Sequence, residues 1–139
     1  TRLAQNAIDL LGLLFANEVD AAKAASDPHW ALFHQIRDHI DENLGDPGLS
    51  PATIAEANYI STRHLHNLFR EKGATVSSYI RSRRLEKCYL DLTSPLRLDV
   101  PIAVVGSRWG FVDAAHFSRV FKATYGESPR TIRERIARP

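Results

Sequence analysis

The chain has 139 residues, of which 44% are hydrophobic and 24% charged, a composition that fits a globular protein with one domain or two small ones. Its longest apolar run, residues 10–16, is too short to span a bilayer and lacks the flanks of a signal peptide, and a single cysteine, Cys88, excludes an internal disulfide framework. Residues 1–60 hold three Lys/Arg against nine Asp/Glu and residues 61–139 hold fifteen against seven, which favours a polyanionic partner for the second part, with an arginine-rich solvated surface as the alternative.

The first predicted elements are two amphipathic helices. Apolar residues recur every three or four positions over residues 3–24, which predicts a helix with one apolar stripe. Asp27-Pro28 supplies a cap and a first helical residue for the next helix, over residues 29–44, and "GDPG" at 45–48 ends it. Because the chain contains no methionine, we expect it to start inside a longer parent protein.

The middle of the chain predicts two short helices and a long one. Ser50-Pro51 caps and opens the first, and a turn over residues 58–60 follows it. Ser61 caps the second, over residues 62–72. Residues 76–92 contain neither glycine nor proline and predict a helix of seventeen residues.

The last part repeats this order. Pro101 opens a short helix to Arg108, Asp113 caps a helix over residues 114–125, and Ser128-Pro129 starts a last helix to about residue 136. No stretch shows the strict alternation of a strand. The sequence therefore predicts an all-α fold.

Two segments of the chain are copies of one motif. The stretch "STRHLHNLFREKGATVSSYI" at 61–80 aligns with "DAAHFSRVFKATYGESPRTI" at 113–132. The alignment needs a one-residue gap in the first stretch, before Gly73. Each copy joins a short helix, a tight turn and a capped second helix, which is a helix-turn-helix. We predict a first helix-turn-helix subdomain with the connecting helix over residues 28–93, a second over 94–139, and a separate N-terminal helix over 1–27.

The second helix of each copy has an apolar side and a polar side. Leucine, valine and phenylalanine positions define the core side, so the opposite side must face outward. A major groove about 12 Å wide admits a helix. There arginine can form two hydrogen bonds with guanine, asparagine can form two with adenine, and alanine can contact the methyl group of thymine. We predict a DNA-binding surface made of Arg63, His66, Asn67 and Arg70 from the first copy and Ala115, His116, Ser118, Arg119 and Lys122 from the second.

Some of these residues have alternative interpretations. Arg70 and Lys122 lie farther along their helices, where phosphates are the expected targets. His64 and His116 fit packing, phosphate contact or base contact equally well, and Ala115 fits tight packing as well as groove contact. Arg119 alternatively pairs with an acidic residue, and the polar side chains of the first copy are alternatively plain solvated surface.

The long helix sets the separation between the two copies. Seventeen residues with a rise of 1.5 Å each give a connecting helix about 25 Å long. With the width of the packed helices added, the second helices of the two copies are expected to lie about 34 Å apart, which is one turn of duplex DNA. One chain is then expected to occupy two successive major-groove segments on one face of DNA.

The chain resembles the DNA-binding domain of the AraC/XylS family of bacterial transcription regulators. The likeness rests on "RRLEKC" at 83–88 and "WGFVDAAHFSRVFKATYGESPRTIR" at 109–133, and it covers about residues 29–137. It implies an all-helical fold with two recognition helices, a rigid connecting helix, and control of transcription, with activation expected. It also implies an effector-sensing or dimerising domain ahead of this one, absent from this chain, whose tail residues 1–25 resemble.

Two positions depart from the family pattern. The first turn has Tyr59 where glycine is common, so we expect Asn58 to take the left-handed backbone conformation. Gly106 stands where alanine is usual, which costs up to about 1 kcal/mol in an exposed helix or permits close packing.

Other functions remain as alternatives. Cys88 is expected to be a buried thiol, with a redox sensor or a DNA-repair alkyl acceptor as the alternative, and the basic helices are alternatively a module that binds acidic proteins. Histidine spacing does not match a metal site, and we expect no cofactor and no enzyme activity. The expected partners are double-stranded DNA and RNA polymerase, with no membrane contact, and the expected location is the cytoplasm, at the nucleoid.

Overall fold

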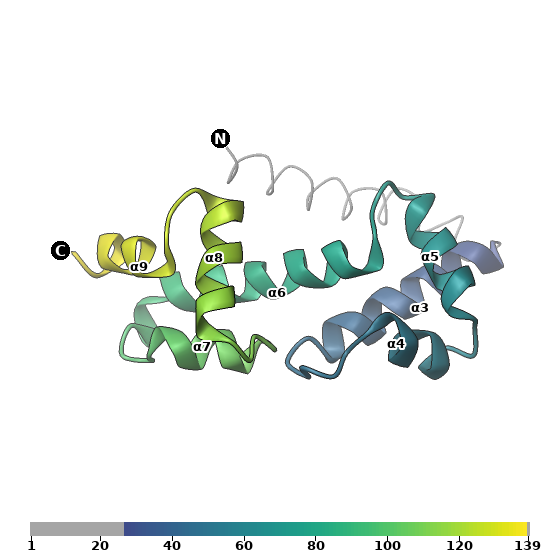
Figure 1. The fold of residues 1–139 in the computed structure, drawn as a ribbon, viewed down its shortest axis with the longest axis horizontal. Coiled ribbons are helices and arrows are strands. Elements are labelled where there is room, and N and C mark those ends of the chain that lie inside the picture. Colours follow the sequence, from purple (N-terminus) through teal and green to yellow (C-terminus); the bar gives the residue numbers. More distant parts are fainter. Residues whose placement is uncertain (1–26, 139) are drawn as a thin grey trace.

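The computed structural model describes residues 27–138, and every regular element in that range is a helix (Figure 1). In chain order these are α3 (Pro28–Glu42), α4 (Pro51–Ala57), α5 (Thr62–Arg70), α6 (Val76–Thr93), the short 3-10 helix η1 (Pro95–Arg97), α7 (Ile102–Arg108), α8 (Ala114–Tyr125) and α9 (Pro129–Ala137). The predicted all-α fold is confirmed over this range, and η1 was not predicted. The helix predicted over residues 3–24 lies outside the described residues.

Side-chain caps start most of these helices where the sequence predicted. Ser50 and Thr75 each form a reciprocal capping box, and Ser61 accepts a hydrogen bond from the amide of His64. Asp113 accepts from the amides of Ala115 and His116. Each such cap contributes about 1 kcal/mol, because it satisfies amide donors that have no partner inside the helix.

The apolar side chains form two cores that share α6. The first core joins α3, α4 and α5 to the beginning of α6, with Phe69 and Val76 fully buried in it. The second joins the end of α6 to α7, α8 and α9, with Cys88 and Phe121 at its centre. Trp109 packs against both cores. Helix α6 thus contributes side chains to both cores. The subdomain boundary predicted at residue 93 stays a prediction.

Gly106 permits close packing of α7 on α8. A Cβ atom at this position would lie 2.8 Å from Cδ2 of Phe117, inside van der Waals contact. Phe117 is itself 1% exposed, and its ring is tilted against that of Phe111, with the centroids 5.0 Å apart. Glycine therefore lets this aromatic ring lie directly on the α7 backbone.

The first turn differs from its prediction. Tyr59, and not Asn58, takes the left-handed conformation, with φ of 57°, whereas Asn58 caps α4 with φ of −107°. Asn58 is buried, and its side-chain amide donates to the carbonyl of Ile54 at 2.8 Å while its oxygen accepts from Gln35 at 3.0 Å. These bonds hold Asn58 at the end of α4, so the reversal of the chain falls on the next residue.

Replacing Tyr59 with glycine is expected to stabilise the fold by about 1 kcal/mol. A side chain with Cβ at φ of 57° is strained, and Tyr59 is 94% exposed, so little packing is lost. Urea unfolding of Tyr59→Gly and Tyr59→Ala measures this gain. The alanine control keeps the strain and should leave the free energy of unfolding within about 0.5 kcal/mol, and equal stabilities for the two variants would contradict the prediction.

Candidate nucleic-acid interface

Helix α5 presents a polar face to solvent because its apolar positions are taken up by the first core. Leu65, Leu68 and Phe69 are at most 1% exposed. The four predicted contact residues of this helix, Arg63, His66, Asn67 and Arg70, are all exposed. The sequence prediction of which side of α5 is buried is therefore confirmed, while the DNA contacts stay a prediction.

Helix α8 repeats the arrangement. Phe117 and Phe121 are at most 1% exposed and Val120 is half-buried. The predicted contact residues of this helix, Ala115, His116, Ser118, Arg119 and Lys122, are all exposed. The short side chains of Ala115 and Ser118 beside Arg119 suit close approach of the helix to a groove floor.

The four cations of these two faces make no direct contact with an acidic side chain among the described residues. Within residues 27–138, Arg63, Arg70, Arg119 and Lys122 form no ion pair and no side-chain hydrogen bond, although other arginines do. The alternative in which Arg119 pairs with an acid is not supported by these contacts. Unpaired cations on an exposed face remain available to phosphates or bases.

The two faces belong to helices that run in the same direction. Figure 1 shows α5 and α8 at separate positions along α6, each rising from its short preceding helix to a loop on the same side of the molecule. The matching order of α4–α5 and α7–α8 follows from the repeat in the sequence. Such an arrangement can present two helices to the same side of a DNA duplex.

The histidines at the edges of these faces are not core residues. His64 is exposed and its ring centroid lies 6.4 Å from that of His29, whose Nε2 pairs with Glu71 at 2.7 Å. His116 is also exposed, 6.5 Å from the ring of Phe111. Packing in the interior, one of the alternatives, is excluded for both, and contact with phosphate or base remains open.

Asp113 gives the start of α8 a fixed negative charge. The amides of His116 and Ala115 donate to its carboxylate at 3.1 and 2.9 Å, and these bonds hold its pKa below the usual range. The positive charge of Arg119 lowers this pKa further through space, although Arg119 and Asp113 do not form an ion pair. Asp113 is therefore a cap, as predicted, at the start of the helix that carries the second polar face.

The arginines of α6 are used mostly within the protein. Arg83 pairs with Asp41 at 3.0 Å and with Glu86, and Arg84 donates to the carbonyls of Leu44 and Asp46. Arg81 is exposed and has no partner among residues 27–138. Of the three arginines that the sequence left between ion pairs and phosphates, only Arg81 is free to reach a phosphate.

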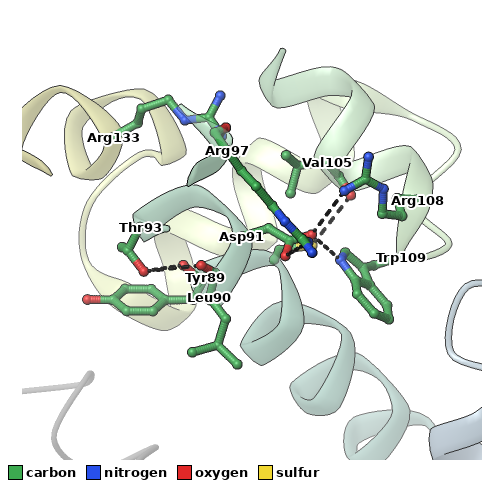
Figure 2. Close-up of polar contacts among 10 residues, drawn as sticks. Tyr89, Leu90, Asp91, Thr93, Arg97, Val105, Arg108, Trp109 and Arg133 are labelled. Carbon is green, nitrogen blue, oxygen red and sulfur yellow. Dashed lines mark hydrogen bonds and ion pairs between the residues drawn. The ribbon is translucent and has the colours of Figure 1, made fainter. Parts of the chain in front are cut away.

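A carboxylate network that sequence analysis did not single out holds the turn before α8 (Figure 2). Asp91 of α6 is 7% exposed and accepts from Arg97 at 2.6 Å and from the indole nitrogen of Trp109 at 2.8 Å, with Arg108 3.5 Å away. The available signal was that Asp91 shares a helix face with the buried Cys88 and Leu92, where a charged group needs partners. The network joins α6, η1 and the end of α7.

Cys88 lies in the second core. It is fully buried, its thiol faces the carbonyl of Val105 at 3.9 Å, and burial raises its pKa to about 12. Since the thiolate is the nucleophile in alkyl transfer and in redox chemistry, the alkyl-acceptor and sensor alternatives lose their chemical basis.

The thiol of Cys88 should therefore be inert to an aromatic disulfide reagent at pH 8 for hours in the native state and react at once in urea. The variant Ser82→Cys, which adds a thiol at an exposed position of α6, is the control and should react at once without urea. Rapid loss of the native thiol of the unmodified chain would contradict the assigned burial.

Residues 27–138 contain neither a cluster of metal-ligating side chains nor a membrane-spanning helix. No three His, Cys, Asp or Glu residues between 27 and 138 are grouped as metal ligands. A shallow groove between α3 and the end of α4 is lined by His34, Asp38, His39 and Glu42 among others. None of the described helices has the length and apolar character needed to cross a bilayer.

Comparison with known proteins identifies the family. A sequence model of a protein family, described as a helix-turn-helix domain, matches residues 54–135, which is more than half of the chain. The chain belongs to the AraC/XylS-type helix-turn-helix family. Three relatives of the chain are named as two transcriptional activators and an operon regulatory protein.

Individual relatives show how far this AraC-type chain extends. It is 33% identical over 135 residues to the transcriptional activator NphR of Rhodococcus sp, covering 97% of this chain and 39% of that protein. It is 34% identical to the arabinose operon regulatory protein of Escherichia coli K12, covering 91% and 43%. A crystal structure of an AraC-type DNA-binding-domain regulator from Chromobacterium violaceum superposes with a TM-score of 0.68 at 27% identity, covering 84% of this chain and 98% of that one. The chain thus spans about two fifths of its curated relatives.

Proposed function

We propose that the chain binds specific DNA sequences by placing the polar faces of α5 and α8 in successive major-groove segments, and that it thereby regulates transcription. The observation that carries this proposal is the matching pair of exposed polar faces, each backed by a buried core, on two copies of one motif. Membership of the AraC/XylS-type family supports it.

The division of labour among the contact residues follows from their side chains. Arg63, Asn67 and Arg119 carry groups that hydrogen-bond base edges, so they supply specificity. Arg70 and Lys122 lie toward the ends of their helices and supply affinity through phosphates. His66, Ala115, His116 and Ser118 complete the two surfaces.

The whole protein is proposed to act as an activator. Two relatives that match the chain over most of its length are named transcriptional activators. From that role we infer contact with RNA polymerase. Since the relatives are more than twice as long as this chain, we also infer a further domain, which by the family resemblance binds an effector and lies ahead of this segment. Such a regulator works in the cytoplasm, at the nucleoid.

A gel-shift comparison tests the proposal. The chain should bind fragments from upstream of its neighbouring genes at least a thousandfold more tightly than random duplex, the usual range for specific sites. Equal binding to both would favour the second candidate, a module for acidic proteins, which the unpaired cations also allow. An acidic protein surface would then compete for the same residues.

Replacing Lys122 with alanine should weaken binding to every sequence alike. One lost phosphate contact lowers the slope of log affinity against log salt by about 1. Titrations of specific and random duplex between low and moderate salt measure both slopes. Lys87→Ala, at a half-buried position of α6, is the matched control and should leave both slopes unchanged. A Lys122→Ala effect on the specific duplex alone would show that Lys122 reads a base.

A further inference from the structure

We propose that a small contact between the two helix-turn-helix units, and not the connecting helix alone, fixes the position of α8 relative to α5 and so sets the half-site spacing that the protein accepts. This inference rests on the proposed function. The contact, called the junction below, consists of Leu44–Asp46 in the loop after α3, Arg84 of α6, and Arg108–Gly110 at the end of α7. In Figure 1 the loop after α3 and the turn after α7 approach each other alongside α6.

The two loops touch through their backbones. A Cβ atom on Gly45 would lie 2.8 Å from the carbonyl oxygen of Arg108, and one on Gly110 would lie 2.9 Å from the carbonyl oxygen of Leu44. Real Cβ atoms do not approach oxygen so closely, so only glycine fits at either position. The contact therefore depends on both glycines and leaves little room for the units to move toward each other.

Arg84 holds the loop of the first unit against α6. Its Nε donates to the carbonyl of Leu44 at 2.9 Å and its Nη2 donates to the carbonyl of Asp46 at 2.7 Å. Its guanidinium carbon lies 2.8 Å from where a Cβ of Gly110 would be, so the planar group also lies against the turn of the second unit. One side chain thus contacts both loops.

Trp109 ties the same turn to both cores. Its ring packs against side chains of the first and the second core. Its indole nitrogen donates to the buried carboxylate of Asp91 at 2.8 Å (Figure 2). The turn that precedes α8 is consequently attached to α6 and to the first unit at once.

This attachment has a consequence for DNA. One base pair more or less between half-sites rotates the second site by roughly 35° about the duplex axis. A long helix can curve gently, whereas two loops in backbone contact add a second connection that resists rotation of one unit against the other. The junction therefore makes affinity depend steeply on spacing.

Gly45→Ala separates the junction from the two cores. Gly45 is exposed and does not have a positive φ, so alanine there brings no backbone strain and its new methyl meets only Arg108. Gly48→Ala is the matched control, because Gly48 lies in the same loop, is exposed, and would bring a Cβ only near the flexible side chain of Asp46.

The test measures affinity for duplexes whose two half-sites, mapped by footprinting, are separated by the native spacing or by one or two base pairs more or fewer. For the unmodified chain and Gly48→Ala we expect a sharp maximum at the native spacing. Gly45→Ala should lose about tenfold in affinity there, show a flattened or shifted profile, and bind each isolated half-site as the unmodified chain does.

Two results would overturn the inference. An unchanged spacing profile for Gly45→Ala would mean that α6 alone sets the spacing, and an equal loss on isolated half-sites would mean that Gly45 acts only on stability.

A DNA-free measurement keeps the junction testable if the chain binds no specific DNA. Spin labels at Thr62→Cys and Ala114→Cys, equivalent exposed positions on α5 and α8, should show one narrow distance that broadens or shifts in Gly45→Ala and not in Gly48→Ala. Identical distance distributions would refute it.

Discussion

Arg119→Ala should relax base preference in one half-site by about ten- to a hundredfold and leave the other half-site unchanged. Arg119 is the exposed, unpaired arginine at the centre of the α8 face, with small residues on either side of it, and a bidentate arginine–guanine contact contributes about 1–3 kcal/mol of discrimination. Binding to a library of half-site variants measures the preference directly.

Two controls make this result specific. Arg63→Ala, the corresponding change on α5, should relax the other half-site. Arg130→Ala removes an arginine that is 82% exposed on α9 and pairs with Glu134, so it should leave both preferences intact. An Arg119→Ala variant with the original footprint and preference would show that the assigned face of α8 is wrong.

Asp91→Ala is expected to lower the free energy of unfolding by about 2–3 kcal/mol. Removing one member of a buried ion pair leaves its partners without compensation, at about 3–5 kcal/mol when all are buried. The expected loss is smaller here because Arg97 and Arg108 are 49% and 43% exposed and can return to water, whereas the indole of Trp109 is half-buried. Urea unfolding measures the loss.

The exposed Asp99 provides the reference for this change. Asp99→Ala should alter stability by less than about 0.5 kcal/mol, as surface substitutions usually do. Asp91→Asn keeps an oxygen acceptor for Trp109 and should fall between the two. If Asp91→Ala were as stable as Asp99→Ala, the network in Figure 2 would not hold the turn before α8.

The helices and their faces could be predicted because local signals determine them. Asp113 and Ser61 each cap a helix through amides two or three residues away, and a helix of nine to twelve residues shows its buried side through spacings of three and four. The polar faces of α5 and α8 follow from the same spacings. Their exposure could therefore be predicted residue by residue.

Contacts between distant segments were not accessible in this way. Arg84 finds its acceptors 38 and 40 residues away, and the glycines at 45 and 110 owe their importance to each other's loops. No pattern along the chain encodes such a meeting. The left-handed residue of the first turn was misassigned for a related reason, since Asn58 is held in place by Gln35 of another helix.

The claim that α5 and α8 occupy two successive major-groove segments on one face of DNA is tested most directly by hydroxyl-radical and guanine-methylation protection on a bound promoter fragment. We expect two protected windows about 10 base pairs apart on the same face, one lost in Arg63→Ala and the other in Arg119→Ala. A single window, two windows on opposite faces, or loss of the same window in both variants would contradict the claim.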